Sequence, residues 1–160
     1  MLIGVFIPAV SYQTQIVVNK PVNHSFLIFT NVNRMADWIP GFKEIETIKS
    51  IPGHIGSKYR LVFESVGQEI EMIEEMIAYK ENELFAFTLS NEVIFSEVEI
   101  SFHAISANET EIIAQTNAKG QNWFWRSVFP FFKSYFQEQT EQQYDTLKQI
   151  IENAPEQITV

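Results

Sequence analysis

Residues 127–152, SVFPFFKSYFQEQTEQQYDTLKQIIE, decide the fold because they predict one long amphipathic helix. Each residue of an α-helix turns about 100° from the previous one. The charged residues then gather on one side, and a stripe of mainly apolar residues forms on the other, namely Phe129, Phe132, Phe136, Thr140, Leu147 and Ile150. Such a helix covers an apolar surface. The aromatic run Trp123-Phe124-Trp125 leads the chain into it.

Two glutamines, Gln139 and Gln143, fall inside this apolar stripe. A buried amide without hydrogen-bond partners costs about 1–3 kcal/mol, so both side chains need partners. They could bind a polar group of a ligand, or they could bind strand backbone, each other or an ordered water. The pattern leaves both interpretations open.

The first part of the chain predicts one strand followed by two short helices. Gln13–Val18 alternates as a strand does. Pro21 suits the first turn of a helix, so we expect a helix over Val22–Thr30. A second helix, over Val32–Trp38, ends before Ile39-Pro40 because the residue preceding a proline is pushed out of helical space.

From Phe42 to Lys119 the hydrophobic period is that of strands, interrupted by short turns. Strands with short connections predict an antiparallel meander. The six expected strands are Lys43–Ile51, Lys58–Val66, Gln68–Tyr79, Leu84–Ser90, Ile94–Ile105 and Thr110–Lys119.

Glu74 is the only catalytic candidate that the alternation suggests. It is in phase with Ile70, Met72 and Met76, so its carboxyl could face the interior, where burial raises a carboxyl pKa into a useful range. The alternative is an exposed acidic face, which is the commoner arrangement in a chain with 20 acidic residues.

Composition indicates one soluble domain. A chain of 160 residues with 46% apolar residues can bury one substantial core. The net charge of −9 argues against nucleic-acid binding, which relies on cationic contacts to phosphate. The aromatic content of 14% is high, with 14 Phe, and this excess favours the binding of a hydrophobic small molecule.

The apolar segment 1–11 is too short to cross a bilayer and lacks the basic flank of a signal peptide. We expect an N-terminal extension at 1–11, one domain at 12–153 and a C-terminal tail at 154–160. The protein is expected to be cytoplasmic and not to have a membrane as a partner. No cofactor or metal is expected, since His24, His54 and His103 lack metal-ligand spacing and the chain has no Cys.

The order of elements and the local sequence resemble the SRPBCC superfamily, also called START-like or helix-grip proteins. The resemblance covers Tyr12–Asn153, and Asn31 stands where many relatives carry Asp. The matching residues are Pro21, Phe26, Trp38, Pro40, Gly53, Gly56 and Leu147-Lys148.

The resemblance implies an α+β helix-grip fold. Its seven-stranded antiparallel curved sheet would wrap around the long C-terminal helix, with two short helices between strands 1 and 2. The cavity between sheet and helix would bind a hydrophobic small molecule or lipid. The residues expected to line it are Trp38, Tyr59, Phe63, Phe87, Phe102, Trp125, Phe132, Phe136, Gln139 and Gln143.

Two other functions stay open beside binding, one of them enzymatic. A cyclase or dehydratase would use Glu74, Gln139 or Tyr59 for proton transfer. An interaction module similar to activators of Hsp90 would fill its cavity with side chains and present a surface instead. A monomer and a homodimer are both compatible with the sequence.

Overall fold

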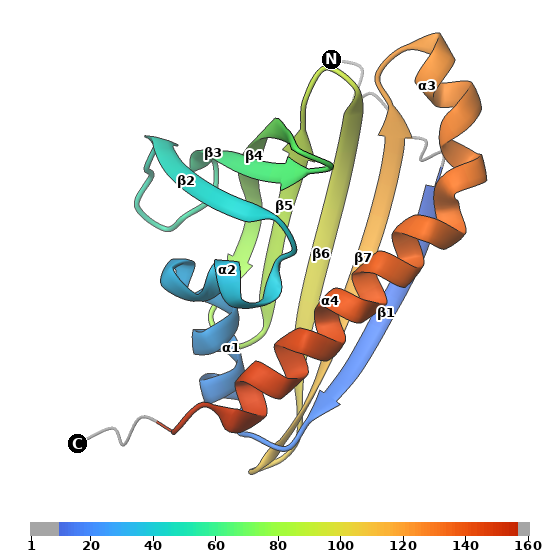
Figure 1. Cartoon of the computed structure of the whole chain (residues 1–160). Coiled ribbons are helices and arrows are strands. Elements are labelled where there is room, and N and C mark those ends of the chain that lie inside the picture. Colours follow the sequence, from blue (N-terminus) through green and yellow to red (C-terminus); the bar gives the residue numbers. More distant parts are fainter. Residues whose placement is uncertain (1–9, 157–160) are drawn as a thin grey trace, which may run out of the picture.

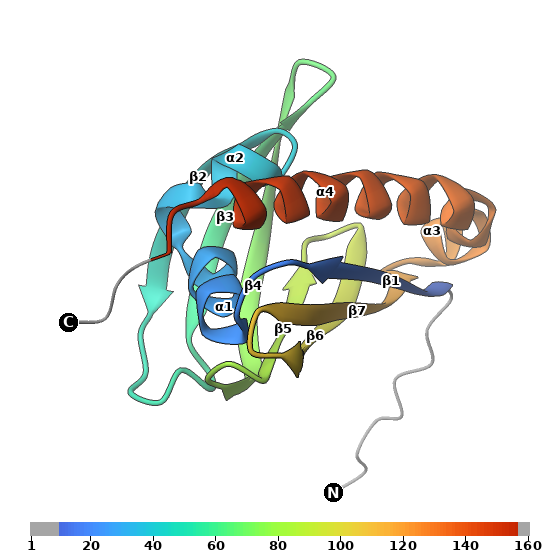
Figure 2. The same cartoon turned by 90° about the horizontal axis from the view of Figure 1, so that it is seen from below.

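A curved antiparallel sheet of seven strands lies against one long C-terminal helix (Figures 1 and 2). The computed structural model describes residues 10–156, so the expectations for residues 1–9 and 157–160 lie outside it. The strands are β1 (Val10–Val18), β2 (Phe42–Lys49), β3 (Lys58–Ser65), β4 (Gln68–Lys80), β5 (Leu84–Ser90), β6 (Ile94–Ser106) and β7 (Glu109–Gly120).

The sheet order is β1-β7-β6-β5-β4-β3-β2. The strands from β2 to β7 therefore form the predicted meander, with each strand beside the next. β1 is the edge strand beside β7 and pairs with it, and Ile16 lies opposite Ile112 in that pair. The expected helix-grip fold class is confirmed, and the long helix crosses the concave face of the sheet (Figure 2).

Between β1 and β2 lie α1 (Val22–Thr30), a 3₁₀ turn η1 (Val32–Arg34) and α2 (Met35–Trp38). The sequence predicts a single helix over the last two of these. It divides because the Asn31 side chain accepts a hydrogen bond from the Asn33 amide at 3.0 Å and opens a 3₁₀ turn first.

The C-terminal helical region is α3 (Trp123–Val128), a 3₁₀ turn η2 (Phe129–Phe132) and α4 (Lys133–Asn153). It starts four residues earlier than the expected Ser127, with Asn122 as its N-cap. Pro130 lies in the 3₁₀ turn, because a proline cannot donate the backbone hydrogen bond of a continuing α-helix.

The buried side of α4 agrees with the expected stripe at Leu147 and differs from it at Gln139. On a regular α-helix Gln139 lies about 80° around the axis from Leu147 and about 120° from Ile151, so it stands at the edge of the stripe. Tyr144, Leu147 and Ile151 are the buried residues of α4. Gln139, expected in the stripe, is exposed instead.

Asn122 fixes the start of α3, because its side-chain oxygen accepts a hydrogen bond from the Trp125 amide at 3.0 Å. Asn122→Ala should lower the free energy of unfolding by about 1 kcal/mol, the usual value of an N-cap. Asn122→Asp keeps an acceptor and should keep most of the stability. Urea denaturation of the three proteins measures this, and an unchanged stability in Asn122→Ala would show that the cap does not stabilise the fold.

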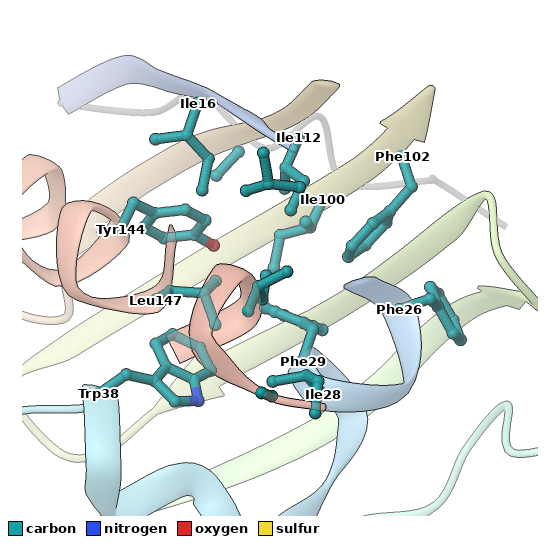
Figure 3. Packing of buried hydrophobic residues seen from close by; sticks show 14 residues of the cluster. Ile16, Phe26, Ile28, Phe29, Trp38, Ile100, Phe102, Ile112, Tyr144 and Leu147 are labelled. Carbon is teal, nitrogen blue, oxygen red and sulfur yellow. The ribbon is translucent and has the colours of Figure 1, made fainter. Parts of the chain in front are cut away.

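The main core lies where α1 and the last turns of α4 meet the sheet (Figure 3). Tyr144 and Leu147 point from α4 toward Ile100 and Ile112 in Figure 3. His24, expected on a polar helix position, is buried, and its Nε2 lies 2.9 Å from the carbonyl oxygen of Ile151. The histidine therefore joins α1 to α4, a contact that helical periodicity could not reveal.

Candidate ligand-binding site

A cavity of about 520 Å³ lies between the concave face of the sheet, α2 and α4. All seven strands contribute side chains to its wall, and most of these side chains are aromatic or aliphatic. Cavities of this size that are mostly apolar and hold a few polar groups are the usual form of small-molecule sites.

Strand register explains how the wall is assembled. Tyr59, Glu74, Leu89 and Ser96 face one another in turn across β3, β4, β5 and β6, and all four line the cavity. A second row, one pleat away, consists of Met76, Phe87, Val98, Thr116 and Tyr12. Because directly opposed residues point to the same face of a sheet, both rows face α4.

Glu74 is the cavity's carboxyl group, and only 8% of the residue is exposed. Its removal from water raises the pKa of its carboxyl to about 7, since burial penalises the charged form. Within residues 10–156, no ion pair and no side-chain hydrogen bond reaches the Glu74 carboxyl. The group is therefore buried, has a pKa near neutral pH and lacks a partner in the described part of the chain.

The neighbouring glutamates of β4 lie on the opposite face. Glu69 and Glu75 form ion pairs with Lys43 at 2.9 Å and Lys58 at 3.5 Å. Glu71 pairs with Arg60, whose charge and hydrogen bond lower the pKa of the Glu71 carboxyl. Strand alternation therefore separates one interior carboxyl from a solvated acidic face.

The other polar groups of the cavity are hydroxyls, an amide and one imidazole. The hydroxyl oxygens of Tyr12 and Thr140 lie 3.2 Å apart, and Tyr12 is the donor because the Thr140 hydroxyl donates to the Phe136 carbonyl. His54, whose φ is +72°, lies against the ring of Tyr79 with 4.2 Å between ring centroids. Among the described residues that line the cavity, none is Lys or Arg.

Tyr144 is the buried aromatic residue of α4 that reaches this wall. Burial raises the pKa of its hydroxyl, so the group stays neutral at any physiological pH. Its ring contacts Trp38 edge to face at 6.2 Å between centroids. Trp38 Nε1 is buried and has no hydrogen-bond partner in the part of the chain that the structure describes.

Six of the candidates named from the sequence come together at this cavity. They are Glu74, Trp38, Tyr59, Phe63, Phe87 and Gln143. Gln143 is half-buried, whereas Gln139 is exposed and lies away from the wall. The two amides expected to act together are therefore separated by the phase of α4.

Four aromatic candidates lie elsewhere. Phe102 is in the core beneath α1, 5.0 Å from the ring of Phe26. Phe136 stacks on Phe129 at 4.9 Å in a second core at the start of α4. Trp125 and Phe132 belong to α3 and η2, outside the cavity wall.

The α3–η2 end also carries the most exposed aromatic rings. Trp123 is 80% exposed and Phe131 is 87% exposed, while half-buried Trp125 lies between them in the chain. This end is well separated from α1 and α2 along the helix (Figure 1).

Several wall residues were not identified from the sequence. His54, Leu89, Ser96, Thr116 and Tyr12 line the cavity through strand register and one turn. Register decides which residues oppose Glu74, and the bulge between Met76 and Ala78 shifts it locally. Alternation alone predicts that Ser96 and Thr116 lie on the inward face of their strands. It does not predict which residues of the neighbouring strands lie beside them.

Neither a metal cluster nor a membrane-spanning helix is present in the described range. No group of three or more His, Asp or Glu side chains in residues 10–156 could hold a metal ion. Among the helices described, none is long and apolar enough to cross a bilayer.

Comparison with known proteins finds similarity in structure but not in sequence. No family model and no curated protein matches the chain. A START superfamily protein from Mycobacterium smegmatis matches with a TM-score of 0.73 and 16% identity, over 89% of this chain and 97% of its own. Ara h 8.0201 matches with a TM-score of 0.70 and 12% identity, over 88% and 96%.

The Zhui aromatase/cyclase from Streptomyces sp. R1128 matches with a TM-score of 0.73 and 11% identity, over 89% of this chain and 93% of its own. Such low identities establish the fold and not the activity. The expected START-like, helix-grip fold is therefore confirmed at the level of fold.

Proposed function

We propose that this protein binds a hydrophobic small molecule or lipid in the cavity between its sheet and α4. The observation that carries the proposal is the open volume of about 520 Å³ with a mainly apolar wall. Unfilled apolar space costs stability, because the side chains around it lose packing contacts that a ligand could restore. An open cavity gives no support to the interaction-module alternative, which requires a filled interior.

A neutral fluorescent probe tests this proposal. N-phenyl-1-naphthylamine should bind saturably at one site, and the double variant Ser96→Phe/Val98→Trp should weaken binding at least about tenfold by filling the cavity. The control Glu97→Phe/Glu99→Trp places the same side chains on the opposite face of β6 and should leave the affinity unchanged. Thermal unfolding checks that both variants fold. Equal affinity in wild type and the cavity-filled variant would refute the proposal.

Glu74 supports a second candidate function, proton-transfer catalysis of the cyclase or dehydratase type. With a pKa of about 7 the carboxyl can take a proton from a carbon next to a carbonyl, or give one to a leaving hydroxyl. Tyr59 lies directly opposite on β3 and could assist. One protein of similar fold is named an aromatase/cyclase, and this analogy of fold also favours the candidate function.

A reactive poly-β-ketone thioester analogue separates catalysis from binding. An enzyme would convert it faster than the spontaneous reaction, and Glu74→Gln would abolish the acceleration while still binding the neutral probe. A conversion rate equal to the background in the wild-type protein would leave binding as the function.

A further inference from the structure

We propose that the ligand is an apolar molecule with a single amine group, whose ammonium lies against the Glu74 carboxyl. The inference rests on the proposed binding function and names its ligand class. It follows from what the cavity wall contains and from what it lacks.

Glu74 is the first observation. Its carboxyl is nine-tenths buried, lines the cavity, and has no ion pair or side-chain hydrogen bond from residues 10–156. Buried carboxyls normally have a partner, and a missing one calls for an explanation. A ligand cation placed in the cavity would supply it with a charge-assisted hydrogen bond.

The absence of Lys and Arg from the described residues of the wall is the second observation. The titratable groups on the wall besides Glu74 are Tyr12, His54, Tyr59, Tyr79 and Tyr144. Tyr59 on β3 and Leu89 on β5 are the direct neighbours of Glu74 in the sheet, and neither is a cation. A fatty-acid carboxylate would enter with no Lys or Arg to meet it, and Glu74 would repel it.

Aromatic rings are the third observation. Tyr59, Phe87 and Trp38 line the same cavity, and their ring faces attract cations within about 6 Å. Together with Leu89, Met76 and Val98 they leave an apolar volume for the rest of the molecule. The site is therefore suited to an amphiphile with a cationic end.

Three ten-carbon ligands with the same chain test this proposal by displacing N-phenyl-1-naphthylamine at pH 8. Decylamine should bind about ten- to a hundredfold more tightly than decanol, the range expected for a hydrogen bond to a charged group. Decanoate should bind more weakly than decanol. Glu74→Gln should abolish the preference for the amine and leave decanol binding nearly unchanged, whereas Glu75→Gln on the outer face should behave as wild type.

The pH dependence adds a second readout. The permanently charged decyltrimethylammonium ion needs an ionised Glu74, so its affinity should fall about tenfold per pH unit below pH 7 and level off above it. Glu74→Gln should remove that dependence. Decanol and decylamine binding equally, or an amine preference that survives in Glu74→Gln, would overturn the inference while the binding function stands. Failure of the neutral probe to bind would refute both.

Discussion

Glu74→Gln is expected to raise the free energy of unfolding of the unliganded protein by about 3 kcal/mol at pH 8. In the wild-type protein the carboxyl has a pKa of about 7 when folded and 4.5 in its unperturbed state. Above pH 7 the folded protein therefore holds a buried charge that has no partner among residues 10–156. Glutamine has nearly the same shape and stays neutral, so the variant avoids that cost.

The direction in which the free energy of unfolding changes with pH follows from proton binding to Glu74. Between pH 4.5 and 7 the folded state holds more protons on Glu74 than the unfolded state does. The free energy of unfolding thus falls as pH rises through this range, by up to about 1.4 kcal/mol per unit, and the fall ends above pH 7. The stability that the raised pKa of Glu74 contributes is therefore fully present below pH 4.5.

Urea denaturation of both proteins from pH 4 to pH 8.5 measures the effect. The difference between the variant and the wild type cancels the other titrating groups and should rise steadily up to pH 7. Glu75→Gln, one residue away on the solvated face, should change stability by less than about 1 kcal/mol and show no such rise. A difference curve that is flat with pH would mean that Glu74 is not buried as described.

Leu147→Ala is expected to lower the free energy of unfolding by about 3–5 kcal/mol. Leu147 is fully buried in α4, within the core cluster that includes Ile100, Ile112 and Phe29. Truncation removes the transfer free energy of the side chain and leaves a void between helix and sheet. Because this helix is also one wall of the cavity, its loosening should weaken probe binding as well.

The exposed residue Gln149 provides the comparison, since Gln149→Ala lies on the same helix and should change stability by less than about 0.5 kcal/mol. Midpoints of urea denaturation at one pH are sufficient for this series. A loss below about 1 kcal/mol in Leu147→Ala would show that α4 is not packed on the sheet through this residue.

The fold could be predicted from local patterns because each element carries its own signal. Alternation marks β6 and β7, Pro21 and Pro40 delimit the two-helix connection, and the amphipathic pattern marks α4. The antiparallel order follows from the short turns between strands. The prediction for Gln139 was wrong because this residue lies at the edge of the apolar stripe, about 80° around the helix axis from buried Leu147.

The site was harder to predict, because its wall depends on contacts between distant strands. Glu74 could be placed inward from its phase within one strand, but its lack of a partner depends on every other wall residue. The aromatic cluster around Trp125 and Phe132 suggested a ligand contact by composition alone. The structure places those rings at the α3–η2 end, outside the cavity wall.

The most direct test of the binding site is a crystal structure of the protein saturated with N-phenyl-1-naphthylamine. We expect electron density for the probe between α4 and the sheet, in contact with Phe87 and Val98 and beside Glu74. Density only on the exposed rings of Trp123 and Phe131, with an empty cavity, would contradict the account.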